Sequence, residues 1–117
     1  MKAAAVVAAL AALAQETRLA IFRLLVEAGE DGLNAGAIAG TLGLAAPTLS
    51  FHIAQLARSG LVSARQEGRY IYYAADFAAM DDLIAYLTEN CCHGAMACLP
   101  KTVAASTTAK RRAKKAA

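Results

Sequence analysis

Two short helical patterns separated by a glycine lie within residues 38–61, and this arrangement limits the fold more than any other feature of the chain. The first pattern ends at Gly43, and glycine commonly ends a helix because it adopts the left-handed conformation without strain. Pro47 suits the first turn of a second helix, where a missing N–H costs nothing. That helix carries an apolar stripe at helical spacing, formed by Leu49, Ile53 and Leu56. A DNA-reading helix-turn-helix and an ordinary helical hairpin both fit this pattern.

Three further helices are predicted around this unit. Residues 16–28 form an amphipathic helix with a wide apolar face, and Asp76 can cap a last helix over residues 77–90. Residues 4–14 are rich in alanine and place Val6, Leu10 and Leu13 on one helical stripe. The apolar stripes of the first and last helices would face water in a monomer. We therefore expect them to form the interface of a homodimer.

A β-hairpin is predicted after the second helix of the motif. Residues 61–66 and 69–74 are rich in β-forming side chains and flank a glycine turn, with Arg65 and Arg69 close to its tip. A hairpin in this position is a wing, whose arginines can reach phosphates or the minor groove; ordinary surface charge is the alternative. The predicted fold is mainly α with a small β-hairpin, a winged helix-turn-helix.

The charge is distributed unevenly along the 117 residues. Residues 1–100 hold six Lys or Arg and nine Asp or Glu, whereas residues 101–117 hold six Lys or Arg and no acid. We expect residues 1–100 to form one DNA-binding and dimerisation domain. Residues 101–117 read as a disordered basic tail that could add nonspecific affinity for DNA.

The first residues resemble a secretory signal, because Met1 and Lys2 precede an apolar run of small side chains. The run of 12 residues from Ala3 to Ala14 is too short to span a membrane. Its helical stripe favours an interface helix of a cytoplasmic protein without a membrane partner. The chain also lacks a phosphate-binding loop, a Ser-His-Asp set and a phosphatase-type Cys-x₅-Arg loop, so we expect no enzymatic activity.

The second helix of the motif divides into an inner and an outer face. At about 100° per residue, His52 falls beside the buried stripe, where a hydrogen-bonded structural role is expected. The N-terminal part of a recognition helix meets base edges. The candidate DNA contacts on this helix are therefore Pro47, Thr48, Ser50, Phe51 and Gln55.

All three cysteines lie within residues 91–98, as Cys91, Cys92 and Cys98. Thiolates select soft ions. Arsenite or antimonite binds three sulfurs in a pyramid, so three cysteines supply the number of ligands that such an ion needs. Zinc needs a fourth ligand, which His93 could supply. Zinc or cadmium sensing, a redox-active cysteine pair and incidental clustering remain alternatives, as does a DNA-organising protein without an inducer.

The ordered motifs resemble the ArsR/SmtB family of bacterial metal-responsive repressors. They are Glu16-Thr-Arg-Leu-Ala-Ile-Phe-Arg-Leu-Leu, Leu49-Ser-Phe-His-Ile-Ala-Gln-Leu, Ser59-Gly-Leu-Val and Glu67-Gly-Arg-Tyr-Ile-Tyr-Tyr, and the match covers roughly residues 14–90. The resemblance implies a winged-helix homodimer that represses its own operon and releases double-stranded operator DNA when an effector binds. Family members often carry a polar residue at the position of Phe51.

The same resemblance bears on the effector. Two family sites lack their ligands here: residues 33–36 hold no Cys-x-Cys pair, and the last helix has aspartates but no histidine. Residues 87–94 are similar to the arsenic repressors with a C-terminal site, in which a vicinal cysteine pair and a later cysteine bind As(III). The implied effector is arsenite, with antimonite or methylarsenite as related forms.

Overall fold

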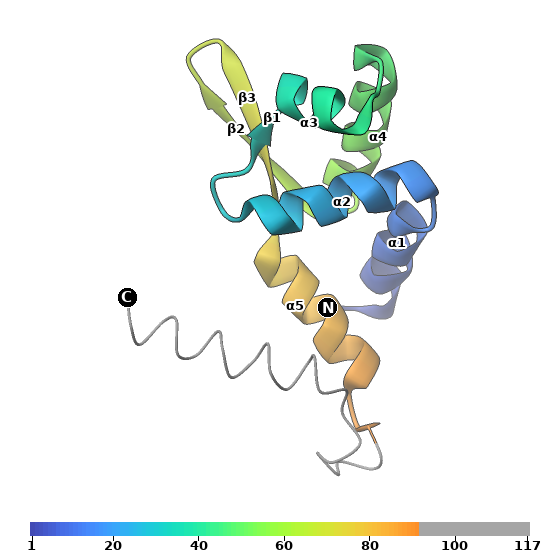
Figure 1. The fold of residues 1–117 in the computed structure, drawn as a ribbon. Coiled ribbons are helices and arrows are strands. Elements are labelled where there is room, and N and C mark those ends of the chain that lie inside the picture. Colours follow the sequence, from blue (N-terminus) through green and yellow to red (C-terminus); the bar gives the residue numbers. More distant parts are fainter. Residues whose placement is uncertain (92–117) are drawn as a thin grey trace. The chain divides into compact units, whose positions relative to one another are not determined.

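The computed structural model describes residues 1–91 (Figure 1). Met1–Leu83 form a first compact unit, and a second unit begins at Ile84. The elements are α1 (Ala3–Leu13), α2 (Glu16–Ala28), β1 (Leu33–Asn34), α3 (Ala35–Leu42), α4 (Ala46–Arg58), β2 (Val62–Glu67), β3 (Tyr70–Ala75) and α5 (Phe77–Thr88). Helices and a small antiparallel sheet confirm the predicted fold class, and the range predicted for α2 matches its observed bounds.

The helix-turn-helix consists of α3 and α4, which lie side by side in Figure 1 and are bent by 111° at their junction. Gly43 follows α3 with a φ of 66°, and both its N–H and that of Leu44 donate to the carbonyl of Ala39. Pro47 lies in the first turn of α4. The turn therefore has the conformation that the sequence predicts, and the angle lies within the range of DNA-reading helix pairs.

The core of the first unit is built from α2, α4 and the start of the hairpin. Ile21 and Leu25 of α2 are fully buried, and the stripe of α4 is buried as predicted. Helix α1 packs on α2 and α4 through Val6, Ala9 and Ala12. Of the predicted stripe, Leu10 is 41% exposed, as expected of a side chain that faces water in a monomer. Val6 of the same stripe is instead buried against the core, and Leu13 is partly buried.

The three strands form one antiparallel sheet in the order β1-β3-β2. The two-residue strand β1 was not predicted; it pairs Leu33 with Tyr73. Just before it, Gly32 has a φ of 72°, and a Cβ at this position would collide with the backbone carbonyl of Tyr73. The hairpin turns at Gly68 and Arg69, and Gly68 has a φ of 60°. A glycine with positive φ at the first loop position is typical of a type II′ turn, which matches the strand twist.

Helix α5 begins as predicted, because the Asp76 carboxylate accepts from the N–H of Ala79 at 3.0 Å. Leu83 is buried, and Phe77 and Met80 are partly buried against the core of the first unit. The helix ends at Thr88, and Asn90 follows with a φ of 58°. The predicted tail, residues 101–117, lies outside the described residues.

Within the described residues, no single helix is long and apolar enough to cross a membrane. Two pairs, α1 with α2 and α3 with α4, reach the required length and composition only together, and they are bent by 102° and 111°.

Candidate nucleic-acid interface

The outer face of α4 is accessible over its N-terminal half. Pro47, Thr48, Ser50 and Phe51 are all exposed, and Phe51 keeps 59% of its surface in contact with solvent. Hydroxyls can bind phosphates or base edges, and an exposed aromatic ring can contact thymine methyl groups. The predicted contact residues therefore come together on one surface, with the exception of Gln55. That residue is half-buried and lines a hollow beside α1.

His52 lies on the inner side of α4 and has a structural partner. Arg18 Nη1 lies 3.4 Å from His52 Nδ1, and Arg18 Nε donates to the carbonyl of Ala12 at 2.7 Å. Because a guanidinium only donates, Nδ1 of His52 is the acceptor in this contact. Its ring also packs edge-on against Phe51, with centroids 5.4 Å apart. The predicted structural role of His52 is confirmed, and Arg18 joins α1 to α4 through it.

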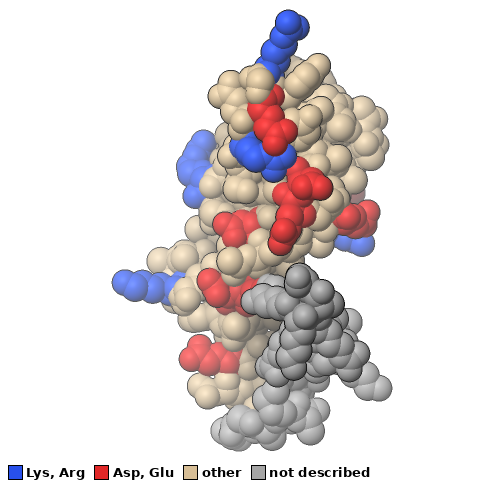
Figure 2. Space-filling model, turned by 90° about the vertical axis from the view of Figure 1, so that its left-hand side faces the viewer, with Lys and Arg blue, Asp and Glu red and all other residues tan. Residues whose placement is uncertain are grey.

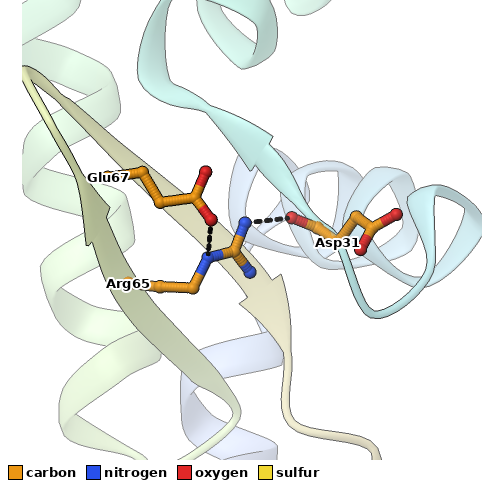
Figure 3. A network of polar contacts seen from close by, with 3 residues as sticks. All are labelled: Asp31, Arg65 and Glu67. Carbon is orange, nitrogen blue, oxygen red and sulfur yellow. Dashed lines mark hydrogen bonds and ion pairs between the residues drawn. The ribbon is translucent and has the colours of Figure 1, made fainter.

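Arg65 of the hairpin has three partners, two of which, Asp31 and Glu67, are drawn in Figure 3. Its Nε donates to Glu67 Oε1 at 2.9 Å, and its Nη2 donates to the carbonyl of Asp31 at 3.2 Å. The guanidinium also lies 5.2 Å from the ring centre of Tyr72, the residue directly opposite it on β3. The carboxylate neutralises its charge, and the carbonyl ties the hairpin to the loop before β1. Arg65 thus holds the wing in place, whatever contacts it makes with DNA.

Arg69 differs from Arg65 in having no hydrogen bond or ion pair with any described residue. It is exposed in the loop at the tip of the hairpin, which projects beyond the helices in Figure 1. On the face seen in Figure 2, the hairpin side, basic side chains stand apart from one another between acidic ones. Positive charge available to a phosphate is therefore local, as at Arg69.

The predicted metalloid ligands lie only partly within the described residues. Cys91 is half-buried and follows the end of α5, whereas Cys92 and Cys98 lie outside the described part of the chain. Among residues 1–91, no three His, Cys, Asp or Glu side chains gather in a way that could hold a metal ion.

Sequence reasoning missed the partners of Arg65. Asp31 is 34 residues away and contributes only a backbone carbonyl, which has no sequence signal. Tyr72 could have been found, because the hairpin register places it opposite Arg65.

Comparison with known proteins agrees with this geometry. A family model described as a helix-turn-helix domain matches residues 13–64. The structure is similar to HlyU from Vibrio cholerae N16961, with 30% sequence identity, a TM-score of 0.60, and coverage of 80% of this chain and 100% of that chain. A search of the curated proteins finds no match.

Two further solved structures carry a family description. Mb0332 from Mycobacterium bovis is a homodimeric winged helix-turn-helix DNA-binding domain and a possible ArsR-family regulator; it is 31% identical, with a TM-score of 0.58 and coverage of 74% of this chain and 80% of that chain. An ArsR-like transcriptional regulator from Rhodococcus sp. RHA1 is 25% identical, with a TM-score of 0.64 and coverage of 96% and 91%. With the helix-turn-helix and wing described above, these similarities show that the chain belongs to the ArsR family of winged helix-turn-helix, DNA-binding transcriptional regulators.

Proposed function

We propose that this regulator is a homodimeric repressor that binds double-stranded operator DNA and releases it when As(III) binds its cysteines. The observation that carries the DNA part is the accessible outer face of α4 together with Arg69 at the wing tip, which has no hydrogen bond or ion pair with residues 1–91. Side chains on α4 would read base edges in the major groove, and Arg69 would bind phosphate or the minor groove. Two-fold symmetry requires an inverted-repeat operator with half-sites about one helical turn, or a multiple, apart.

The apolar surface of α1 supports the homodimer. Val7 is 65% exposed and Leu10 is 41% exposed. The similar domain from Mycobacterium bovis is a homodimer. We expect Leu10→Asp, or Ile84→Asp in α5, to yield a monomer with weak DNA binding, whereas Ala20→Asp on the exposed side of α2 should remain dimeric. Sedimentation velocity measures this difference, and a dimeric Leu10→Asp protein would refute the assigned interface.

The clustering of all three cysteines supports As(III) as the effector. Because α5 ends at Thr88 and Asn90 adopts a left-handed conformation, Cys91 lies beyond the helix. In a continuous helix, neighbouring cysteines would diverge by about 100°, so this ending favours convergence of Cys91 and Cys92 on one ion. Three thiolates match the coordination of arsenite or antimonite, and binding would constrain the segment that follows α5.

We expect As(III) binding to lower operator affinity by a moderate factor. An effector acts only through its different affinity for the two states, and typical coupling is about 1–3 kcal/mol, or about 5–150-fold in operator affinity. Gathering the sulfurs would pull on the end of α5 and alter the spacing of the two recognition helices. Two sites in a dimer would add their effects.

Titration of a fluorescent operator, taken from DNA upstream of the protein's own gene, tests this proposal. Each Cys→Ser variant should bind the operator normally, because the cysteines lie outside the DNA-reading surface. Cys91→Ser and Cys92→Ser should lose release by arsenite, whereas Cys98→Ser should still respond to methylarsenite, which offers two exchangeable positions.

Parallel titrations separate the effector classes. Release of wild-type protein by zinc, cadmium or a thiol oxidant, but not by arsenite or antimonite, would replace As(III) with one of those signals. Release by arsenite from the Cys91→Ser, Cys92→Ser double variant would refute the mechanism outright.

A further inference from the structure

A hollow of about 310 Å³ lies between α1, the start of α2 and the C-terminal half of α4. It is lined by Ala8, Ala11, Ala12, Arg18, Gln55, Arg58 and Ser59. Its volume lies at the lower end of the range for small-molecule sites. From the two arginines and the alanine wall we infer that this hollow binds a small organic anion, either a carboxylate or a phosphate ester, through Arg18 and Arg58.

The charge of the lining favours an anion. Among the described residues that line the hollow there are two arginines and no acid. Arg58 has no hydrogen bond or ion pair with any described residue. A guanidinium presents donors in a planar fork that fits carboxylate and phosphate oxygens, so an anion would satisfy both charges.

The guanidinium of Arg18 is oriented by the protein before any ligand binds. Its Nε is bound to the Ala12 carbonyl at 2.7 Å, and its Nη1 lies 3.4 Å from His52 Nδ1. These contacts orient the guanidinium but use only two of its five N–H groups. The side-chain amide of Gln55, which also lines the hollow, has no partner in the described part of the chain and supplies a further donor. Little side-chain entropy would be lost when the ligand binds.

The apolar part of the ligand would lie on α1. The three lining residues from this helix are alanines, so the hollow exists because no larger side chain fills it. Alanine methyl groups offer an apolar wall without a hydrogen-bonding group.

The hollow is compatible with the proposed dimer. At about 100° per residue, Ala8 lies beside Ala12 at one edge of the buried stripe of α1, whereas Leu10 lies beyond the other edge, about 160° from Ala8. Dimerisation centred on Leu10 would therefore leave the Ala8 side of the hollow open. The anion site stands independently of the proposed As(III) response, because its lining contains no cysteine.

An NMR titration of the ¹⁵N-labelled full-length protein tests the inference. Inorganic phosphate and butyrate are added separately at constant ionic strength, with chloride as the replaced anion. We expect saturable shifts of amides lining the hollow with at least one of the two probes, and the probe that saturates identifies the preferred head group. Shifts that grow linearly with both probes would overturn the inference.

Variants distinguish the hollow from surface charge. Arg58→Gln should weaken binding about tenfold or more, as expected for loss of a charge-assisted hydrogen bond, whereas Arg23→Gln, an exposed arginine of α2 outside the lining, should bind as wild type. Ala8→Leu should fill the hollow and abolish binding, while Ala57→Leu on the opposite flank of α4 should not. Equal affinity of Arg58→Gln and Arg23→Gln, or of Ala8→Leu and wild type, would overturn the site. Saturable shifts of the same amides with DNA, but with neither phosphate nor butyrate, would also overturn it.

Discussion

The two faces of α4 differ in what surrounds them. The inner face, formed by Leu49, Ile53 and Leu56, is buried, and α4 packs against α1, α2, α3 and β2. The outer face carries two hydroxyls and one aromatic ring, in Thr48, Ser50 and Phe51, and all three are exposed. A single helix thus holds the fold on one side and, in the proposed function, would contact DNA on the other. Stability and operator affinity should therefore respond to different substitutions, although buried and exposed residues are interspersed along the same 13-residue helix.

The largest effect is expected on the inner face. Leu56 is fully buried, so Leu56→Ala should lower the free energy of unfolding by about 3 kcal/mol through lost burial and a new cavity. Phe51→Ala removes a larger side chain, but from an exposed position, and should change it by about 0.5 kcal/mol or less. Urea denaturation of the two variants measures both values. If Phe51→Ala destabilised the protein as much as Leu56→Ala, the distinction between the faces would fail.

A second effect, of intermediate size, is expected in DNA binding. Ser50→Ala and Phe51→Ala should each weaken operator binding by about 1–3 kcal/mol and relax the base preference at one position of the half-site. The free energy of unfolding should stay near the wild-type value. Binding to a set of singly substituted operators measures the preference, and Ala57→Ser, on the same helix, serves as control. Uniform weakening on all sequences would assign these side chains to phosphates instead of bases.

The smallest effect is expected in the salt dependence of DNA binding, where variants of Arg65 and Arg69 should differ. Arg69→Gln should weaken binding to all sequences and reduce the slope of affinity against salt concentration by about one unit. Arg65→Gln should leave that slope nearly unchanged, because the carboxylate of Glu67 already neutralises its charge. Fluorescence anisotropy over a series of salt concentrations measures both slopes. Equal reductions in the two variants would show that Arg65 exchanges Glu67 for a phosphate.

The elements that sequence predicted well are those with strong local signals. Helix α2 repeats its apolar residues over 13 positions, and Gly43 and Pro47 mark the turn by their backbone restrictions. The strand β1 has two residues, too few for an alternating pattern, and it forms only because β3 is available beside it. Short-range patterns therefore predicted the helices and the hairpin, whereas β1 depended on tertiary proximity.

For the candidate site too, the sequence predicted the features set by one helix and missed those set by packing between elements. Exposure of Thr48, Ser50 and Phe51 followed from helical periodicity alone. The bond from Arg65 to the Asp31 carbonyl, and the hollow left by alanines of α1, depend on how elements pack and could not be read from spacing. Gln55 shows the same limit, because periodicity placed it at the edge of the outer face, and packing of α1 turned that edge into the wall of a hollow.

Gly32 has a consequence for genetics. Every other amino acid would bring a Cβ into the Tyr73 carbonyl, and the positive φ adds strain to any such replacement. If the protein is the proposed repressor, random mutagenesis followed by a screen for lost repression should recover changes at this codon alongside changes at Thr48 or Ser50. Immunoblots should tell them apart, because Gly32 mutants should be depleted by proteolysis and recover at low growth temperature, whereas mutants of the reading face should accumulate normally at any temperature.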